Sequence, residues 1–327
     1  MSKAALASQR QLLILLSKGD FVSGQKAADE LGLSRTAIAN HIKLLQALGL
    51  DIYTVKGRGY RLALPLNLLD AAQIVKRKDT ALPEVLVQSI TDSTNSQLMQ
   101  KVLDGGVKTP GYVVVAEAQT AGRGRRGRAW YSPFGASLYF SMYWRLEQGV
   151  QAAMGLSLVV AIALCRVLQR EYKLTPSVKW PNDVYLDGKK LAGILVELAG
   201  QADAACDVII GIGLNIQLPQ HSGSYIDQHY TDLTSSVAAH IDRNQLIVLL
   251  QRELIDILRQ FSQAGFADFA SEFNKLDLFF MQPVTLSGSS DTKGICLGVD
   301  KQGALLIKTA SGTQTLFGGE VSLRPGE

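Results

Sequence analysis

A six-residue stretch of glycine and arginine, GRGRRG at positions 122–127, has the composition of a phosphate-binding loop. Its spacing also matches G-x-G-x-x-G, which in dinucleotide-binding folds places backbone amides against a pyrophosphate at the start of a helix. That motif needs a strand before the glycines and a helix after them. GYVVVAEAQ predicts the strand, but the alternating residues of LYFSMYW predict a second strand where the helix should begin. A Rossmann-type site is therefore excluded.

The arginines of this loop suggest a different phosphate site. Arg123, Arg125, Arg126 and Arg128 repel one another unless an anion draws them together. A triphosphate would do this, through guanidinium groups and glycine amides that both point at its oxygens. A plain basic surface loop is the alternative. A G-x-x-x-x-G-K-[ST] sequence and the H-R-D and D-F-G motifs of protein kinases are absent from the sequence.

Other polar groups gather at predicted element boundaries. VKWPNDVYLDGKKLAGILVEL predicts strand, turn and strand, with Lys179, Asp183 and Lys190 close together along the chain. VIIGIGLNIQL predicts a further strand that contains Asn215. SITDSTNSQLM places a run of hydrogen-bonding side chains at a helix start. These segments must fold around the glycine loop if all of them serve one site.

The first 65 residues predict a winged helix-turn-helix. GQKAADEL is a short helix ended by Gly32, and Ser34 is a good N-cap for the helix in RTAIANHIKLLQALGL. In that second helix Ile38, Ile42 and Leu45 share one face. Two short strands, DIYTV and YRLAL, then flank the basic turn KGRG. A helix-turn-helix followed by such a hairpin is typical of DNA-binding domains.

Polar and basic residues occupy the second helix and the wing. We expect the helix residues to meet base edges and the wing residues to meet phosphates or a minor groove. The predicted DNA contacts are Ser34, Arg35, Thr36, Asn40, Lys43, Lys56 and Arg58. Residues 1–64 hold nine Lys/Arg and four Asp/Glu, so the basic balance of the chain lies here. A bundle that uses its basic face for protein contacts is the alternative.

Composition bounds the remaining possibilities. With 327 residues and 47% hydrophobic content, the chain is long and apolar enough for two or three globular domains. Three isolated cysteines fit a reducing cytosol, and the four histidines lack zinc-site spacing. The apolar stretch 152–165 is too short to span a membrane, so we expect a buried helix, a cytoplasmic protein and no membrane partner.

Five segments occur in the order found in biotin–protein ligases. They are DSTN, EAQTAGRGRRGRAW, KWPND, KKLAGILVE and GIGLNI. With the winged helix in front of them, the whole chain resembles the members of this family that are both biotin ligase and biotin operon repressor. The resemblance implies an α/β multidomain fold. Its parts are a winged helix-turn-helix (1–65), a class II synthetase-like mixed-sheet α/β catalytic domain (66–275) and a C-terminal SH3-like β-barrel (276–327).

The same resemblance implies two reactions and a regulatory role. Biotin and MgATP give biotinyl-5′-AMP and pyrophosphate, and the biotinyl group then passes to a lysine of the biotin carboxyl carrier protein of acetyl-CoA carboxylase. The adenylate is also implied as corepressor, under which the chain forms a homodimer, binds operator DNA and represses biotin biosynthesis genes. No dimer seam is evident in residues 1–64, so the larger domain must supply it.

Position within the matching motifs assigns roles to individual residues. Catalytic roles fall to Lys190, Arg123, Arg125 and Asp183, and ligand contacts to Ser93, Thr94, Asn95, Gln119, Arg123, Gly124, Arg125, Trp130, Lys190, Gly193 and Asn215. The residues of DSTN should hold biotin, and Gln119 with the glycine loop should line its carboxylate and the phosphates. Lys190 should bridge carboxylate and α-phosphate. Asn215 should meet adenine, with Trp130 as a lid, and Asp183 should assist Mg²⁺ or orient Lys190.

The residue types agree with this chemistry independently of the resemblance. Adenylation brings two anions together and so needs fixed positive charge, and the motifs offer Arg and Lys without a Ser–His–Asp arrangement. A lipoate or octanoyl ligase on the same scaffold, a sensor that binds biotin or its adenylate without transfer, and an unrelated nucleotide-sensing repressor are the alternatives. The polar stretch 217–233 matches no motif and receives no role.

Overall fold

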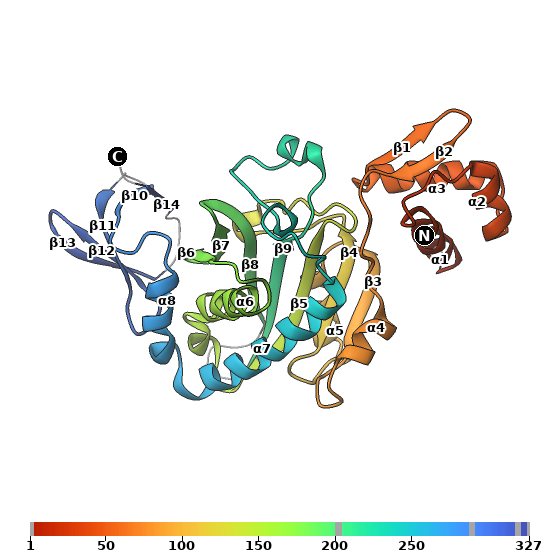
Figure 1. Cartoon of the computed structure of the whole chain (residues 1–327). Helices are drawn as coiled ribbons and strands as arrows, with labels where there is room; N and C mark the ends of the chain where they lie inside the picture. Colours follow the sequence, from red (N-terminus) through yellow and green to blue (C-terminus); the bar gives the residue numbers. More distant parts are fainter. Residues whose placement is uncertain (1–2, 200–204, 288–291, 318–321, 326–327) are drawn as a thin grey trace.

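The structure, a computed structural model, describes residues 3–199, 205–287, 292–317 and 322–325. Figure 1 shows a small helical domain at the N-terminal end, a central sheet with helices packed on it, and a small strand domain at the C-terminal end. The three parts lie in a row, with the central sheet between the other two.

The N-terminal domain consists of three helices and a two-stranded antiparallel wing. Its elements are α1 (Lys3–Leu16), α2 (Gly24–Leu31), α3 (Arg35–Ala47), β1 (Ile52–Val55) and β2 (Gly59–Leu62). Gly32 ends α2 in the left-handed conformation, with φ at 65°. Ser34 caps α3 by accepting a hydrogen bond from the backbone N–H of Ala37 at 3.1 Å, and the three apolar residues predicted for the inner face are buried. The predicted winged helix-turn-helix is confirmed.

A seven-stranded mixed sheet forms the central domain, in the order β3-β4-β5-β9-β8-β7-β6. Only β3 and β4 pair in parallel, and the other neighbours are antiparallel. The strands are β3 (Val85–Thr91), β4 (Val113–Gln119), β5 (Ser137–Leu146), β6 (Ser177–Lys179), β7 (Asp183–Leu186), β8 (Lys189–Ala199) and β9 (Cys206–Asn215). The glycine loop joins β4 to β5, which confirms strand, loop and strand.

Helices pack on both faces of this sheet. The helices α6 (Leu156–Tyr172) and α7 (Arg243–Ala264) share one hydrophobic core with it, and α5 (Thr94–Leu103) packs on the opposite face (Figure 1). By length and composition, the segment that contains α6 could cross a membrane. Eleven residues of α6 are instead buried in the core, which confirms the predicted buried helix.

A buried ion pair holds the segment that links the N-terminal and central domains. Arg243 Nη1 lies 2.8 Å from Glu117 Oε2, and the two side chains are only 1% and 2% exposed. Arg243 also donates to the carbonyl oxygens of Asn67 and Ser137, and Glu117 accepts from the backbone N–H of Leu69. A buried ion pair needs such additional hydrogen bonds, and here the linker supplies two of them. The short helix α4 (Ala71–Arg77) follows directly.

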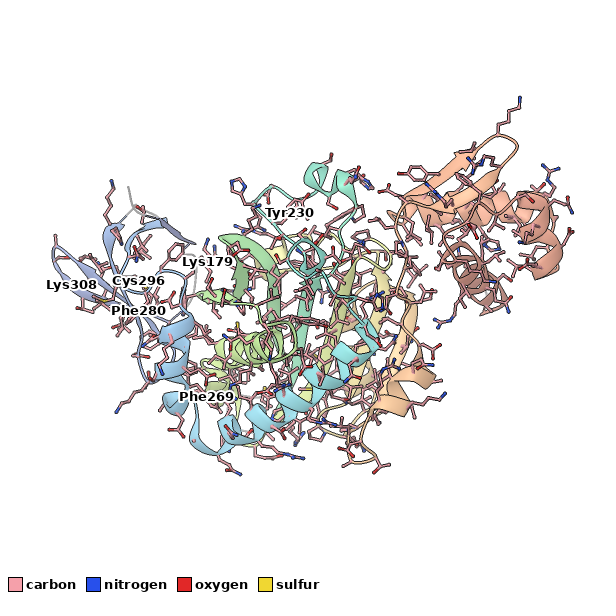
Figure 2. All side chains as sticks on the ribbon, viewed as in Figure 1. Lys179, Tyr230, Phe269, Phe280, Cys296 and Lys308 are labelled. Carbon is pink, nitrogen blue, oxygen red and sulfur yellow. The ribbon has the colours of Figure 1, made fainter. Side chains whose placement is uncertain are left out.

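The C-terminal domain is a five-stranded antiparallel sheet that follows α8 (Ala270–Leu276). In the order β13-β12-β11-β10-β14, its strands are β10 (Pro283–Ser287), β11 (Thr292–Val299), β12 (Leu305–Thr309), β13 (Gly312–Leu316) and β14 (Ser322–Pro325). Figure 2 marks Cys296 and Lys308 on this sheet. Trp180 Nε1 donates to the carbonyl oxygen of Gly303 at 3.1 Å and ties the sheet to the central domain. The predicted C-terminal β domain is present, and among the described residues its strands form a sheet in which β13 and β14 are not paired to close a barrel.

Candidate active site

A cavity of about 760 Å³ lies over β8 and β9, enclosed by the glycine loop, the start of α5 and the loop after β9. Eleven residues predicted from the motifs line it: Ser93, Thr94, Asn95, Gln119, Arg123, Gly124, Arg125, Trp130, Asp183, Lys190 and Gly193. Asn215 is the predicted residue that does not line this cavity. It is buried at the end of β9, and its Nδ2 donates to the carbonyl oxygen of Thr231 at 3.0 Å.

Three glycines make the floor of the cavity. Gly193 on β8 and Gly211 and Gly213 on β9 line it. A Cβ atom at Gly193 or Gly213 would collide with the Trp130 ring, and one at Gly211 would collide with the Asn95 amide. Bare backbone is therefore required here, so that the ring and the amide can lie against the sheet. The sequence suggested Trp130 as a lid, and in this structure its ring rests on the floor.

A chain of hydrogen bonds orders the polar end of the cavity. The backbone N–H and the hydroxyl of Thr94 both lie within hydrogen-bonding reach of Gln119 Oε1, at 2.9 and 3.1 Å. Gln119 Nε2 in turn donates to Ser132 Oγ at 3.0 Å. Ser141 Oγ lies 2.7 Å from Thr94 Oγ1 and donates to Asn95 Oδ1 at 2.6 Å. These hydrogen bonds fix which groups at this end of the cavity donate and which accept. Ser93 begins α5 as its N-cap.

Lys190, near the start of β8, meets Asp183, at the start of β7. Lys190 Nζ lies 2.7 Å from Asp183 Oδ2, and both side chains are largely buried. The ammonium group is also 5.5 Å from the centroid of the Trp130 ring. A largely buried, paired cation keeps a fixed position, as stabilisation of developing negative charge requires.

The loop after β9, which received no role from the sequence, contributes to this site. The backbone N–H of Lys190 donates to the carbonyl oxygen of His229 at 3.0 Å, and its carbonyl accepts from the N–H of Thr231 at 2.9 Å. Figure 2 shows Tyr230 on this segment, beside the sheet. Three residues of the same loop, Tyr225, Asp227 and Gln228, line the cavity. A polar loop without periodicity gave no signal for these contacts.

The arginines of the glycine loop have different surroundings. Arg125 Nη1 donates to Asn182 Oδ1 at 3.1 Å. Burial, and next the neighbouring Arg126, lower the pKa of the Arg125 guanidinium, whereas Asp183 raises it. Arg126 is in the left-handed region with φ at 58°, an uncommon conformation for a residue other than glycine. Arg123, the first arginine, contacts Ser96 and Glu197 instead.

The carboxylates that line the cavity are Asp183 and Asp227. Among the residues that the structure describes, groups of three or more His, Cys, Asp or Glu suited to a metal ion are not found. Mg²⁺ at nucleotide sites is usually held by one or two carboxylates together with substrate phosphates and water. The two carboxylates therefore fit a magnesium ion that binds together with a nucleotide, rather than one held by protein ligands alone.

The predicted DNA-contacting face is exposed. Arg35, Thr36, Asn40 and Lys43 lie on the outer side of α3, and Lys56 and Arg58 lie on the wing. The guanidinium of Arg58 lies 4.4 Å from the centroid of the Phe21 ring, so the ring supports its position. Ser34 is also exposed, and its side chain serves as the N-cap.

The N-terminal domain touches the segments that surround the cavity. The carbonyl oxygen of Leu48 accepts from the backbone N–H of Phe134 at 2.9 Å, just after the glycine loop. His221, in the loop after β9, has Nδ1 3.4 Å from Asp51 Oδ1 and Nε2 3.4 Å from the Tyr131 hydroxyl. Tyr131 stacks on Tyr225, with ring centroids 4.6 Å apart. The segment that follows the glycine loop and the loop after β9 therefore both contact the N-terminal domain.

Comparisons with known proteins identify each part of the chain. A family model described as "Biotin/lipoate A/B protein ligase family" matches residues 87–215, one described as "HTH domain" matches 8–61, and one described as "Biotin protein ligase C terminal domain" matches 282–324. The "Bifunctional ligase/repressor BirA" of Escherichia coli (strain K12) is 45% identical over 97% of both chains.

A second relative and a solved structure agree with these matches. The "Bifunctional ligase/repressor BirA" of Bacillus subtilis (strain 168) is 30% identical over 96% of this chain and 98% of its own. The structure of a biotin protein ligase from Aquifex aeolicus in complex with biotin and ATP is 28% identical, with a TM-score of 0.64. It covers 74% of this chain and 99% of the Aquifex chain.

Proposed function

Since this chain belongs to the biotin/lipoate A/B protein ligase family, and within it to the bifunctional ligase/repressors, we propose that it activates biotin with ATP and transfers it to a carrier protein. The observation that carries the proposal is the meeting of eleven motif residues, from four separate segments of the chain, around one cavity. The similarity of these residues to those of known ligases would be weak support for the proposal if they lay far apart in the structure.

In the first reaction a biotin carboxylate oxygen attacks the α-phosphorus of ATP. The new bond gives biotinyl-5′-AMP, and the bond to the β-phosphate breaks to release pyrophosphate. Arg123 and Arg125 offset the repulsion between the two anions, and Lys190 stabilises the charge that builds up on the α-phosphate oxygens. Asp183 keeps the Lys190 ammonium in place at 2.7 Å. Asp183 is the candidate protein ligand of a magnesium ion bound with ATP, which would supply further neutralisation of the phosphates.

In the second reaction the amine of a carrier lysine attacks the carbonyl carbon of the adenylate. An amide forms, AMP leaves with the electron pair of the broken anhydride bond, and the amine loses a proton. The nucleophile belongs to the partner, which explains why the site holds cations and amides rather than a nucleophile with a base. The carrier that we propose is the biotin carboxyl carrier protein of acetyl-CoA carboxylase.

The N-terminal domain makes the chain a repressor of biotin biosynthesis genes as well as an enzyme. We propose that biotinyl-5′-AMP is the corepressor and that the adenylate-bound chain forms the homodimer that binds operator DNA. The contacts of Asp51 with His221, and of Tyr131 with Tyr225, support a route by which a filled cavity can influence the DNA-binding domain. A cytoplasmic location fits three cysteines that are all unpaired and buried.

Intact-mass spectrometry of a carrier domain tests the ligase directly. After incubation with the full chain, biotin and MgATP, the carrier should gain the mass of one biotinyl group, and Lys190→Ala should abolish the gain. A folded protein that binds biotin but leaves the carrier unmodified would favour a sensor without transfer. Lipoate in place of biotin should give no adduct.

A further inference from the structure

Glu197 lies next to the proposed biotin site, although no motif assigned it a role. It is on β8, on the same side of the strand as Gly193 and Leu195, because alternate residues of a strand face the same way. Gly193 and Leu195 line the cavity. Glu197 is the next residue along this face, at the edge of the cavity.

Its carboxylate has two partners that come from different parts of the site. Oε2 accepts a hydrogen bond from Asn95 Nδ2 at 2.7 Å, and Oε1 accepts one from Arg123 Nη2 at 3.0 Å. Asn95 belongs to the start of α5, and Arg123 is the first arginine of the glycine loop. One carboxylate therefore ties both segments to β8.

For Asn95, this contact determines which way the amide points. Nδ2 faces Glu197 and, at 3.3 Å, the carbonyl oxygen of Leu195, and Oδ1 faces the hydroxyl of Ser141. An ionised carboxylate accepts hydrogen bonds and donates none, so it cannot pair with the amide oxygen. Glu197, which makes the shorter of the two contacts to Nδ2, therefore helps to fix the orientation of an amide that lines the cavity.

For Arg123, the same contact supplies a counter-charge. The other described partner of its guanidinium is the neutral hydroxyl of Ser96, at 2.7 Å from Nη1. The Arg123 side chain is 43% exposed, so its ion pair with Glu197 contributes little to the stability of the fold. Its effect is to hold one arginine of a self-repelling loop against α5 and β8.

We propose that Glu197 is a positioning residue for the biotin end of the site, an inference that rests on the proposed function. It orders Arg123 and Asn95 before the ligand arrives, so that less ordering is needed when biotin binds. Loss of its charge leaves Arg123 without a carboxylate partner and weakens the binding of biotin and of the adenylate. Adenylation itself is affected less, because Lys190, seven residues earlier on β8, keeps its own partner Asp183.

Glu197→Gln tests the proposal because it removes the charge at nearly constant shape. We expect the KM for biotin and the dissociation rate of preformed biotinyl-5′-AMP each to rise about tenfold, the range for loss of one charge-assisted hydrogen bond. The kcat for adenylation, measured as pyrophosphate release, should change by less than about threefold. Glu197→Asp should give a KM and a dissociation rate between those of the wild type and of Glu197→Gln. Glu147→Gln, at an exposed ion pair with Arg145, is the matched control.

A double-mutant cycle separates positioning from a general effect on folding. Arg123→Gln should raise the KM for biotin, and adding Glu197→Gln to it should raise it little further, because the contact is already lost. If the effects of the two substitutions on the KM were additive, the proposal would be overturned. It would also be overturned if Glu197→Gln had the KM and the dissociation rate of the wild type. A loss confined to kcat would also overturn it. If the wild-type chain forms no adenylate, the proposed function fails and the inference with it.

Discussion

The ammonium group of Lys190 lies 2.7 Å from Asp183 Oδ2, so one oxygen of this carboxylate is engaged by a cation. Both side chains are largely buried, and Lys190 lies near the start of β8, seven residues before Glu197. The two roles suggested for Asp183, to orient Lys190 or to bind Mg²⁺, predict different results on substitution.

Lys190→Ala should lower the rate of adenylation by about 10²–10³-fold, the usual cost of losing one donor that stabilises transition-state charge. Asp183→Asn should lower it by about tenfold, because the ammonium remains but is less firmly placed. If Asp183 serves only to orient Lys190, the Mg²⁺ concentration for half-maximal rate should stay the same in Asp183→Asn. A large increase in that concentration would instead identify Asp183 as a metal ligand.

Gly213→Ala should impair nucleotide binding, because the added Cβ would lie 2.5 Å from the Trp130 ring and force it to move. We expect the KM for ATP to rise by about tenfold or more, since small misplacements in such sites are costly. Steady-state kinetics would measure this. Gly106→Ala is the control, because its Cβ would meet only the carbonyl oxygen of Lys101, at 3.4 Å.

Arg243→Met should destabilise the protein by about 3–5 kcal/mol, because it leaves the Glu117 carboxylate buried without its cation. The shift of the urea unfolding midpoint would measure the loss. Adding Glu117→Leu removes the unpaired charge and should restore much of the stability. A double variant that is no more stable than Arg243→Met would show that the linker contacts of Asn67 and Leu69 matter more than the charge.

Asp277 should make stability depend on pH. Burial raises the pKa of its carboxyl group, an effect that the hydrogen bonds from Phe279 and Cys296 partly offset. The folded state therefore binds the proton more tightly than the unfolded state, and the linked stability is full below the unfolded pKa of about 4 and is lost as pH rises through the folded pKa. Asp277→Asn should raise the melting temperature at about pH 7 and have little effect near pH 4. An equal effect at both pH values would exclude this linkage.

Arg58→Ala and Arg35→Ala should affect DNA binding in different ways. Arg58, on the wing, should contact phosphate, so its loss should weaken binding to all sequences and reduce the salt slope by about 1. Arg35, at the N-terminal end of α3, should contact a base, so its loss should relax specificity at one operator position. Binding titrations on operator and mutated operators over a range of salt concentrations would distinguish them.

Local signals made much of this molecule predictable. The left-handed Gly32 ends α2 and the Ser34 cap begins α3, and each signal depends only on residues nearby in the sequence. The end of α2 and the start of α3 could therefore be located from the sequence alone. Eleven of the twelve predicted site residues line one cavity, and Asn215 does not. Ser141 and Glu197 could not be assigned in this way, because their contacts depend on how β5, β8 and β9 align in the sheet. The loop after β9 has no periodicity, and its pairing with Lys190 follows from tertiary structure alone.

The glycine floor has a consequence for inhibitor design. A compound that lies flat on Gly193, Gly211 and Gly213 would touch peptide groups rather than side chains. A substitution at any of these positions adds a Cβ that displaces Trp130 or Asn95, so a variant that repels the compound also damages its own site. Resistance mutations at these glycines would therefore also reduce activity. Resistance that keeps activity would have to come from substitutions at the rim of the cavity.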